Sequence, residues 1–229
     1  LHLAPFKMSG YNTCASASKG CAAACLNTAG NPVYLKGKLA ARIAKTIMYF
    51  EDRALFTAIL IKEVIAASNK ASKANMALAF RLNATSDIKW EKAKLSHIGV
   101  MSSLLAILHA SAPMAKFYDY AKDHKRTSDT LPSFYSLTYS LSEENDISSS
   151  MVLIRGDNLA VVFDTKRGKP LPATYIINGV SAVVIDGDLT DYRPDDVKGV
   201  IVGLRAKGEA IGSNSGFVRP AIQSTFFKA

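Results

Sequence analysis

The hydrophobic pattern of the chain changes between helical and extended periods. Between residues 38 and 68, apolar side chains recur at steps of three and four residues, which predicts a long amphipathic helix. Helices are also predicted over residues 90–109 and 142–156, the second of them opening with Ser142-Glu143-Glu144-Asn145. Three helical segments are therefore expected, separated by stretches of other character.

Short apolar runs bounded by polar residues predict strands between these helices. The runs lie at residues 76–82, 116–120, 133–140, 159–163, 182–185 and 199–204, and residues 1–11 are predicted to hold the end of a first strand. Strands that alternate with helices are typical of parallel α/β folds. The chain has neither GxGxxG nor GxxxxGK[ST], which argues against the two nucleotide-binding folds that these motifs mark. We predict a parallel (β/α) barrel or partial barrel of about six to eight strands, formed by residues 1–229 as a single domain.

Length and composition fit this prediction. The chain has 229 residues, 48% of them hydrophobic and 21% charged, which excludes disordered, collagen-like and coiled-coil proteins. No apolar run reaches the ~18–20 residues of a membrane span, and residues 1–10 lack the apolar stretch of a secretory signal. The sequence begins at Leu1 and not at Met, so we expect that residues are missing before it.

The net charge of +9 is distributed unevenly. Residues 1–126 carry 18 basic and 7 acidic side chains, residues 127–197 carry 5 and 11, and residues 198–229 carry 5 and 1. A basic half beside an acidic stretch favours a polyanionic partner such as nucleic acid, next to a region that holds cations or protons. The basic residues form no dense run, so a solvated lysine face is the alternative.

The three cysteines lie within twelve residues, at Cys14, Cys21 and Cys25, before a turn predicted at Ala29-Gly30-Asn31-Pro32. An odd count argues against a closed disulfide framework. Thiolates confined to one small-residue segment favour a metal centre, either an iron–sulfur cluster with one open iron or a zinc site. Redox chemistry and a tight loop of buried small residues are the alternatives. Zinc would need a fourth ligand, for which the candidates are His2, His97, His109 and His124.

Polar residues follow the predicted strands at the ends where barrel enzymes carry their chemistry. Along the chain they are Asn83, Ser86, Asp87, Asp119, Lys122, Ser140, Glu143, Asp164, Asp186, Asp188, Asp191, Arg205 and Lys207. Carboxylates at such positions can act as acid or base, hold a cation or bind a ribose, and the cations can bind phosphate. The alternatives are helix caps at Asp87 and Ser142, a tight turn around Gly187, and solvated strand ends.

Several motifs resemble a bacteriophage family, the gene-product-eighty-eight-like proteins, along nearly the whole chain. These motifs are Gly20-Cys21-Ala22-Ala23-Ala24-Cys25, Arg81-Leu82-Asn83 with Ser86-Asp87, Ile185-Asp186-Gly187-Asp188 and Gly199-Val200-Ile201-Val202-Gly203-Leu204-Arg205-Ala206-Lys207-Gly208. The resemblance implies a phage-encoded protein that works in the cytoplasm of a bacterial host, and it implies no particular reaction. The cysteine loop is also distantly similar to that of radical S-adenosylmethionine enzymes, although its C-x6-C-x3-C spacing differs from theirs.

Two classes of function follow from these observations. The first is a metal-dependent enzyme that acts on nucleic acid or nucleotides, with an iron–sulfur cluster on the cysteines and S-adenosylmethionine as a candidate cofactor. In this hypothesis Asp87, Asp186 and Asp188 are catalytic, while Asn83, Ser86, Arg205 and Lys207 bind cofactor or substrate. A variant is a base-exchanging transglycosylase with Asp87 and Asp186 as nucleophile and base. The second class is a zinc-stabilised protein, without enzymatic activity, that binds nucleic acid or a host protein.

Overall fold

The computed structural model describes residues 1–27, 35–97, 100–128 and 130–222, so the turn predicted at residues 29–32 lies outside the described residues. The helices are α1 (Phe6–Ser9), α2 (Lys19–Ala23), α3 (Lys36–Glu51), α4 (Arg53–Lys73), α5 (Leu104–Ser111), α6 (Lys125–Ser128) and α7 (Asp146–Ile154), with short 3-10 turns η1 (Trp90–Lys92) and η2 (Gly208–Ala210). The strands are β1 (Ala79–Arg81), β2 (Lys94–His97), β3 (Val100–Ser103), β4 (Lys116–Ala121), β5 (Tyr135–Ser140), β6 (Leu159–Phe163), β7 (Thr174–Ile177), β8 (Val180–Asp186), β9 (Ile201–Arg205) and β10 (Val218–Arg219).

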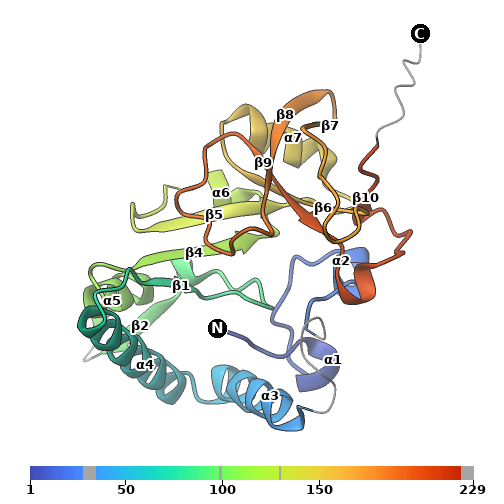
Figure 1. The fold of residues 1–229 in the computed structure, drawn as a ribbon. Coiled ribbons are helices and arrows are strands. Elements are labelled where there is room, and N and C mark those ends of the chain that lie inside the picture. Colours follow the sequence, from blue (N-terminus) through green and yellow to red (C-terminus); the bar gives the residue numbers. More distant parts are fainter. Residues whose placement is uncertain (28–34, 98–99, 129, 223–229) are drawn as a thin grey trace. The chain divides into compact units, whose positions relative to one another are not determined.

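The main sheet is mostly parallel, which confirms the α/β class (Figure 1). Its strand order is β1-β4-β5-β6-β9-β8-β7, with β10 beside β6. Within the described residues β1 and β7 are its two edges and do not pair with each other, so the predicted barrel is not confirmed. The physical reason at one edge is a hairpin. Asn178 and Gly179 both have positive φ, and this turn brings β7 back antiparallel to β8 instead of extending a parallel series.

The chain divides into two compact units, and strands β4 and β5 run through both of them. The first unit comprises Leu1–Ala15, Pro32–Asp119 and Thr130–Ser136. It contains α1, α3, α4, α5, the β2–β3 hairpin and β1. Its core includes a cluster of aromatic rings in which Tyr49, Phe56 and Trp90 contact one another. Burying these large rings supplies much of the apolar stabilisation of this unit.

The second unit comprises Ser16–Asn31, Tyr120–Asp129 and Leu137–Ala229. Here α7 packs against β6, β7 and β8, where apolar side chains form the core. The members of this core are Tyr139, Leu141, Val152, Leu153, Leu159, Val161, Phe163, Tyr175, Ile177 and Ile201. Because parallel strands are covered by helices, their sequences read as nearly continuous apolar runs. Such runs made β6 and β9 recognisable in the sequence.

The strands predicted after residue 75 are confirmed, with bounds that differ from the predicted ones by a few residues at most. Several of the predicted helix bounds are wrong. The helix predicted over residues 38–68 is two helices, because Asp52 interrupts it and its side chain caps α4 by accepting the Leu55 N–H. The helix predicted over residues 90–109 begins only at Leu104, where Ser103 caps α5. The β2–β3 hairpin precedes it. Residues 1–11 contain the short helix α1, bounded by Pro5 and a left-handed Gly10, and not a strand.

Candidate functional site

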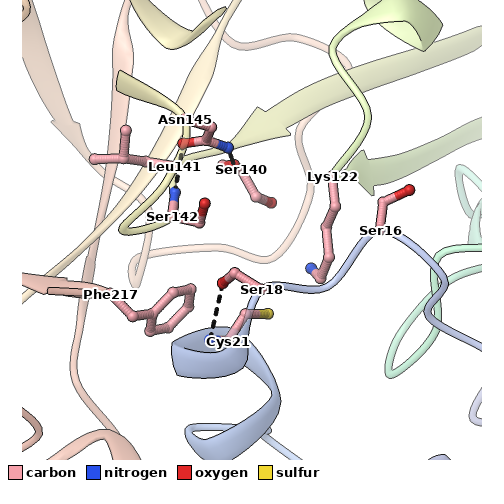
Figure 2. A pocket seen from close by; sticks show the side chains of 9 residues that line it. All are labelled: Ser16, Ser18, Cys21, Lys122, Ser140, Leu141, Ser142, Asn145 and Phe217. Carbon is pink, nitrogen blue, oxygen red and sulfur yellow. Dashed lines mark hydrogen bonds between the residues drawn. The ribbon is translucent and has the colours of Figure 1, made fainter. Parts of the chain in front are cut away.

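A small pocket of the second unit lies where β4 and β5 end (Figure 2). Its empty space, partly open to solvent, is about 200 Å³. The pocket is lined by Ser16, Ser18, Cys21, Lys122, Ser140, Leu141, Ser142, Asn145 and Phe217. The value of about 200 Å³ includes open solvent, so the enclosed space is much smaller and admits at most a small polar group.

The pocket is located where the sheet splits. Strand β5 pairs with β6 only through Tyr139 and Ser140, whereas β10 pairs with the later residues Val162 and Phe163 of β6. β5 therefore leaves β6 after Ser140, and β10 takes its place. In open α/β sheets, ligands bind in crevices outside the carboxyl ends of the strands.

Asn145 holds the loop that forms one wall of the pocket. Its side-chain oxygen accepts the Ser142 N–H at 2.7 Å, and its amide nitrogen donates to the Ser140 carbonyl at 3.0 Å and to the Tyr139 hydroxyl at 2.9 Å. Arg219 of β10 donates to the Ser142 carbonyl at 2.7 Å. The loop from Ser140 to Asn145 is thus fixed by side chains, which preorganises this wall.

Cys21 and Lys122 approach the pocket from different elements. Cys21 lies on α2, Lys122 follows β4, and both side chains point toward the same space (Figure 2). Burial raises the pKa of the Cys21 thiol, and the hydrogen bond and positive charge of Lys122 offset this only in part. The thiol is therefore neutral at pH 7, and Lys122 supplies the positive charge of the pocket.

The lining contains four serine hydroxyls, of which those of Ser18 and Ser142 have partners in the chain. The side chains of Ser16 and Ser140 make no hydrogen bond to any part of the chain that the structure describes, so they can donate to a ligand. The ring of Phe217, just before β10, forms an apolar side of the same pocket. The arrangement offers one ammonium group, hydroxyl donors and an aromatic surface.

The predicted metal ligands are divided between the units. Cys14 belongs to the first unit, where its Sγ lies 3.8 Å from the Thr85 carbonyl, while Cys21 and Cys25 belong to the second and interact electrostatically. All three cysteines are free thiols. Over residues 1–27, 35–97, 100–128 and 130–222, no three His, Cys, Asp or Glu side chains are grouped so that they could hold a metal ion. The structure thus does not support the predicted cluster, and the metal centre stays a prediction.

Asn83, Ser86 and Asp87 form a buried hydrogen-bonded turn in the first unit. The side-chain oxygen of Asn83 accepts bonds from the Ser86 hydroxyl, the Ile88 N–H and the Trp90 indole N–H, at 2.8, 3.0 and 3.0 Å. Its own N–H and amide donate to Asp119, which is fully buried. Asp87 is buried beside them and does not cap η1, whose N-cap is Lys89. These contacts give Asn83 a structural role in shaping the loop after β1.

Asp186, Asp188, Arg205 and Lys207 neutralise one another at the ends of β8 and β9. Arg205 lies 2.8 Å from Asp186 and 3.0 Å from Asp188, and Lys207 lies 2.7 Å from Asp188. The hydrogen bond from Arg205 lowers the pKa of Asp186. Burial raises the pKa of Asp188, but hydrogen bonds from Lys207 and Arg205 hold it below its usual range. Arg205 thus pairs with both carboxylates, and the four charged side chains bind one another.

Sequence reasoning overlooked part of the pocket. Lys122 and Ser140 were expected at strand ends, but Ser16, Ser18, Asn145 and Phe217 were not singled out. Ser18 carried a usable signal, because a serine directly before a short small-residue helix is a typical N-cap, and its side chain does accept the Cys21 N–H. The position of Phe217 depends on β10, which is too short to recognise in the sequence.

The comparisons with known proteins agree with the motif resemblance. The family profile described as Gene product 88 matches residues 2–221. The chain belongs to the Gene product 88 family. No curated protein and no solved structure matches it. Among the described residues, no helix is both long and apolar enough to cross a membrane.

Proposed function

We propose that this member of the Gene product 88 family binds the phosphate group of a nucleotide or a nucleic acid in the pocket of the second unit. The observation that carries the proposal is the ammonium group of Lys122 in a pocket whose lining includes Ser16 and Ser140, outside the carboxyl ends of parallel strands. A phosphate offers several acceptor oxygens to such donors.

The remaining lining favours a nucleotide over a free anion. Phe217 presents an aromatic ring at the edge of the pocket, and bases stack on such rings whatever their identity. The space is too small for a whole nucleotide, so the base and sugar extend toward solvent along this ring. Phosphate recognition with stacking at the rim is common in proteins that bind single-stranded nucleic acid.

The charge of the first unit, taken by itself, favours nucleic acid as a partner. This unit carries 14 basic and 6 acidic side chains, whereas the second carries 14 and 13. Eight of the basic residues lie between residues 36 and 73, on helices α3 and α4. A surface of this sign attracts the phosphate backbone without reading its sequence.

Chemistry on the bound nucleotide is a separate proposal. The iron–sulfur cluster, zinc, S-adenosylmethionine and base exchange that the sequence predicts are not needed for phosphate binding. The neutral Cys21 thiol contributes a weak donor to the pocket wall in this account.

Calorimetric titration with nucleoside 5′-monophosphates and with a 5′-phosphorylated single-stranded oligonucleotide tests the proposal. A charge-assisted hydrogen bond contributes about 1.5–3 kcal/mol, so Lys122→Met should weaken binding by about 10- to 100-fold. Lys125→Met is the matched control, because it removes the same charge three residues away, at an exposed position of α6. Equal affinities for the two variants, or no binding to the unaltered protein, would contradict the proposal.

A further inference from the structure

We propose that Glu143 is the positioning residue of this pocket, because its carboxylate fixes the helix that carries Cys21. The inference rests on the proposed function only in taking this pocket as the binding site. Glu143 does not line the pocket itself. It acts instead on Ser18 and on helix α2, which carries Cys21 of the lining.

The carboxylate of Glu143 binds the start of α2 through both oxygens. Oε1 accepts the Gly20 N–H at 2.6 Å, and Oε2 accepts the Ser18 hydroxyl at 2.8 Å. The Ser18 oxygen in turn accepts the Cys21 N–H at 3.2 Å. A continuous chain of hydrogen bonds therefore leads from the carboxylate to the backbone of Cys21.

The surrounding glycines show how closely this carboxylate fits. A Cβ at Gly20 would lie 2.7 Å from Oε2 of Glu143 and 2.7 Å from the Ser215 hydroxyl. A Cβ at Gly216, which has φ +87°, would lie 3.1 Å from Cβ of Glu143. Side chains are thus excluded on two sides of Glu143, and the carboxylate is clamped between α2 and the segment before β10.

The pKa of Glu143 agrees with an ionised carboxylate that holds α2 through hydrogen bonds. Burial alone would raise the pKa of Glu143, but hydrogen bonds from Gly20 and Ser18 and the charge of Arg219 hold it below its usual range. The carboxylate is therefore ionised at neutral pH. Arg219 also pairs with Asp146 at the start of α7, so the loop that carries Glu143 is fixed from the β10 side as well.

Loss of the clamp should release α2. This helix has five residues, and an isolated helix of that length does not persist in water. Without the carboxylate, the Gly20 N–H and the Ser18 hydroxyl lose their acceptor. Cys21 would then leave its position beside Lys122 and become exposed.

The rate at which iodoacetamide alkylates Cys21, followed by peptide mass spectrometry, measures this release, with Cys14 of the first unit as internal reference. Removing hydrogen bonds to a charged group should increase the labelling rate of Cys21 in Glu143→Ala by about tenfold or more. Glu143→Gln keeps one acceptor and should give an intermediate rate. Glu144→Ala is the matched control, because its exposed side chain neighbours Glu143 in sequence.

A second pair of variants separates positioning from general loss of structure. Ser18→Ala breaks the link to Cys21 and should speed labelling, whereas Ser18→Thr keeps the hydroxyl and should restore the unaltered rate. Equal Cys21 rates in Glu143→Ala and Glu144→Ala, or a Ser18→Thr variant as fast as Ser18→Ala, would overturn the inference. Nucleotide binding reports on the proposed function separately. If Glu143→Ala binds nucleotide with normal affinity and its Cys21 is labelled at the unaltered rate, only the positioning role is rejected.

Discussion

Gly20 is a residue whose lack of a side chain is required by its neighbours. Gly20→Ala would push the Glu143 carboxylate out of its hydrogen bonds, and this should lower the free energy of unfolding by about 1–3 kcal/mol. Gly37 in α3 is the control, because a Cβ there meets nothing within 4 Å. Gly37→Ala should be neutral or stabilising by up to about 1 kcal/mol. Urea denaturation of both variants checks this, and equal losses would contradict the clamp.

Arg205 binds two carboxylates, so the stability lost when it is substituted should depend on pH. Because the folded pKa values of Asp186 and Asp188 lie below the usual value, their stabilisation is complete near neutral pH and declines as pH falls below about 4. Arg205→Met should cost about 2 kcal/mol at pH 7 and clearly less at pH 3.

Arg155→Met is the comparison for this ion pair, since Arg155 and Asp157 form a half-exposed surface pair that should contribute under about 1 kcal/mol. Denaturation of both variants at several pH values measures how much stability each substitution costs. A loss in Arg205→Met that does not change with pH would mean that packing, and not charge, explains the role of Arg205.

Sequence alone placed several residues correctly at strand ends but could not assign their partners. Asp186 and Arg205 directly end β8 and β9, as their apolar runs indicated. Their mutual pairing depends on the adjacency of two strands with an intervening segment of 14 residues, which no local pattern encodes. For the same reason Asn83 was expected in a binding site, whereas its side chain organises its own loop.

The β7–β8 hairpin is the element whose turn has the strictest conformational requirement. Asn178 and Gly179 have φ of 46° and 81°, the combination of a tight two-residue hairpin. Asn178→Gly should be tolerated, whereas Gly179→Ala should destabilise the protein by about 1 kcal/mol, because a side chain is strained at this φ. Thermal denaturation compares the two variants. An unaffected Gly179→Ala variant would contradict this account of the edge strand.

Elements with strong local signals were predictable, and those defined by side-chain caps were not. β6 has the bounds that were predicted for it, residues 159–163. A short, fully apolar run is typical of a buried strand, and the polar residues on either side mark its ends. The break between α3 and α4 lies at Asp52, whose side chain accepts the Leu55 N–H, inside a continuous helical pattern. The Asn-Gly signal for the β7–β8 turn was present in the sequence and would have argued against a closed barrel.

At the scale of the whole molecule, the prediction of a single domain can be tested by calorimetry. Strands β4 and β5 each contribute residues to both compact units, so neither unit has a complete set of strands of its own. We therefore expect one cooperative thermal transition whose van't Hoff and calorimetric enthalpies agree. Two separate transitions would show that the units unfold independently.

The central claim, that a phosphate-bearing ligand occupies the pocket beside Lys122 and Cys21, is tested most directly by protection of Cys21 from alkylation. A saturating nucleoside 5′-monophosphate or 5′-phosphorylated oligonucleotide should slow the labelling of Cys21 and leave that of Cys14, in the other unit, unchanged. At the same ligand concentration, Lys122→Met should reduce this protection. Unchanged labelling of Cys21 at a ligand concentration where calorimetry shows binding would mean that the ligand binds elsewhere, and the claim would be wrong.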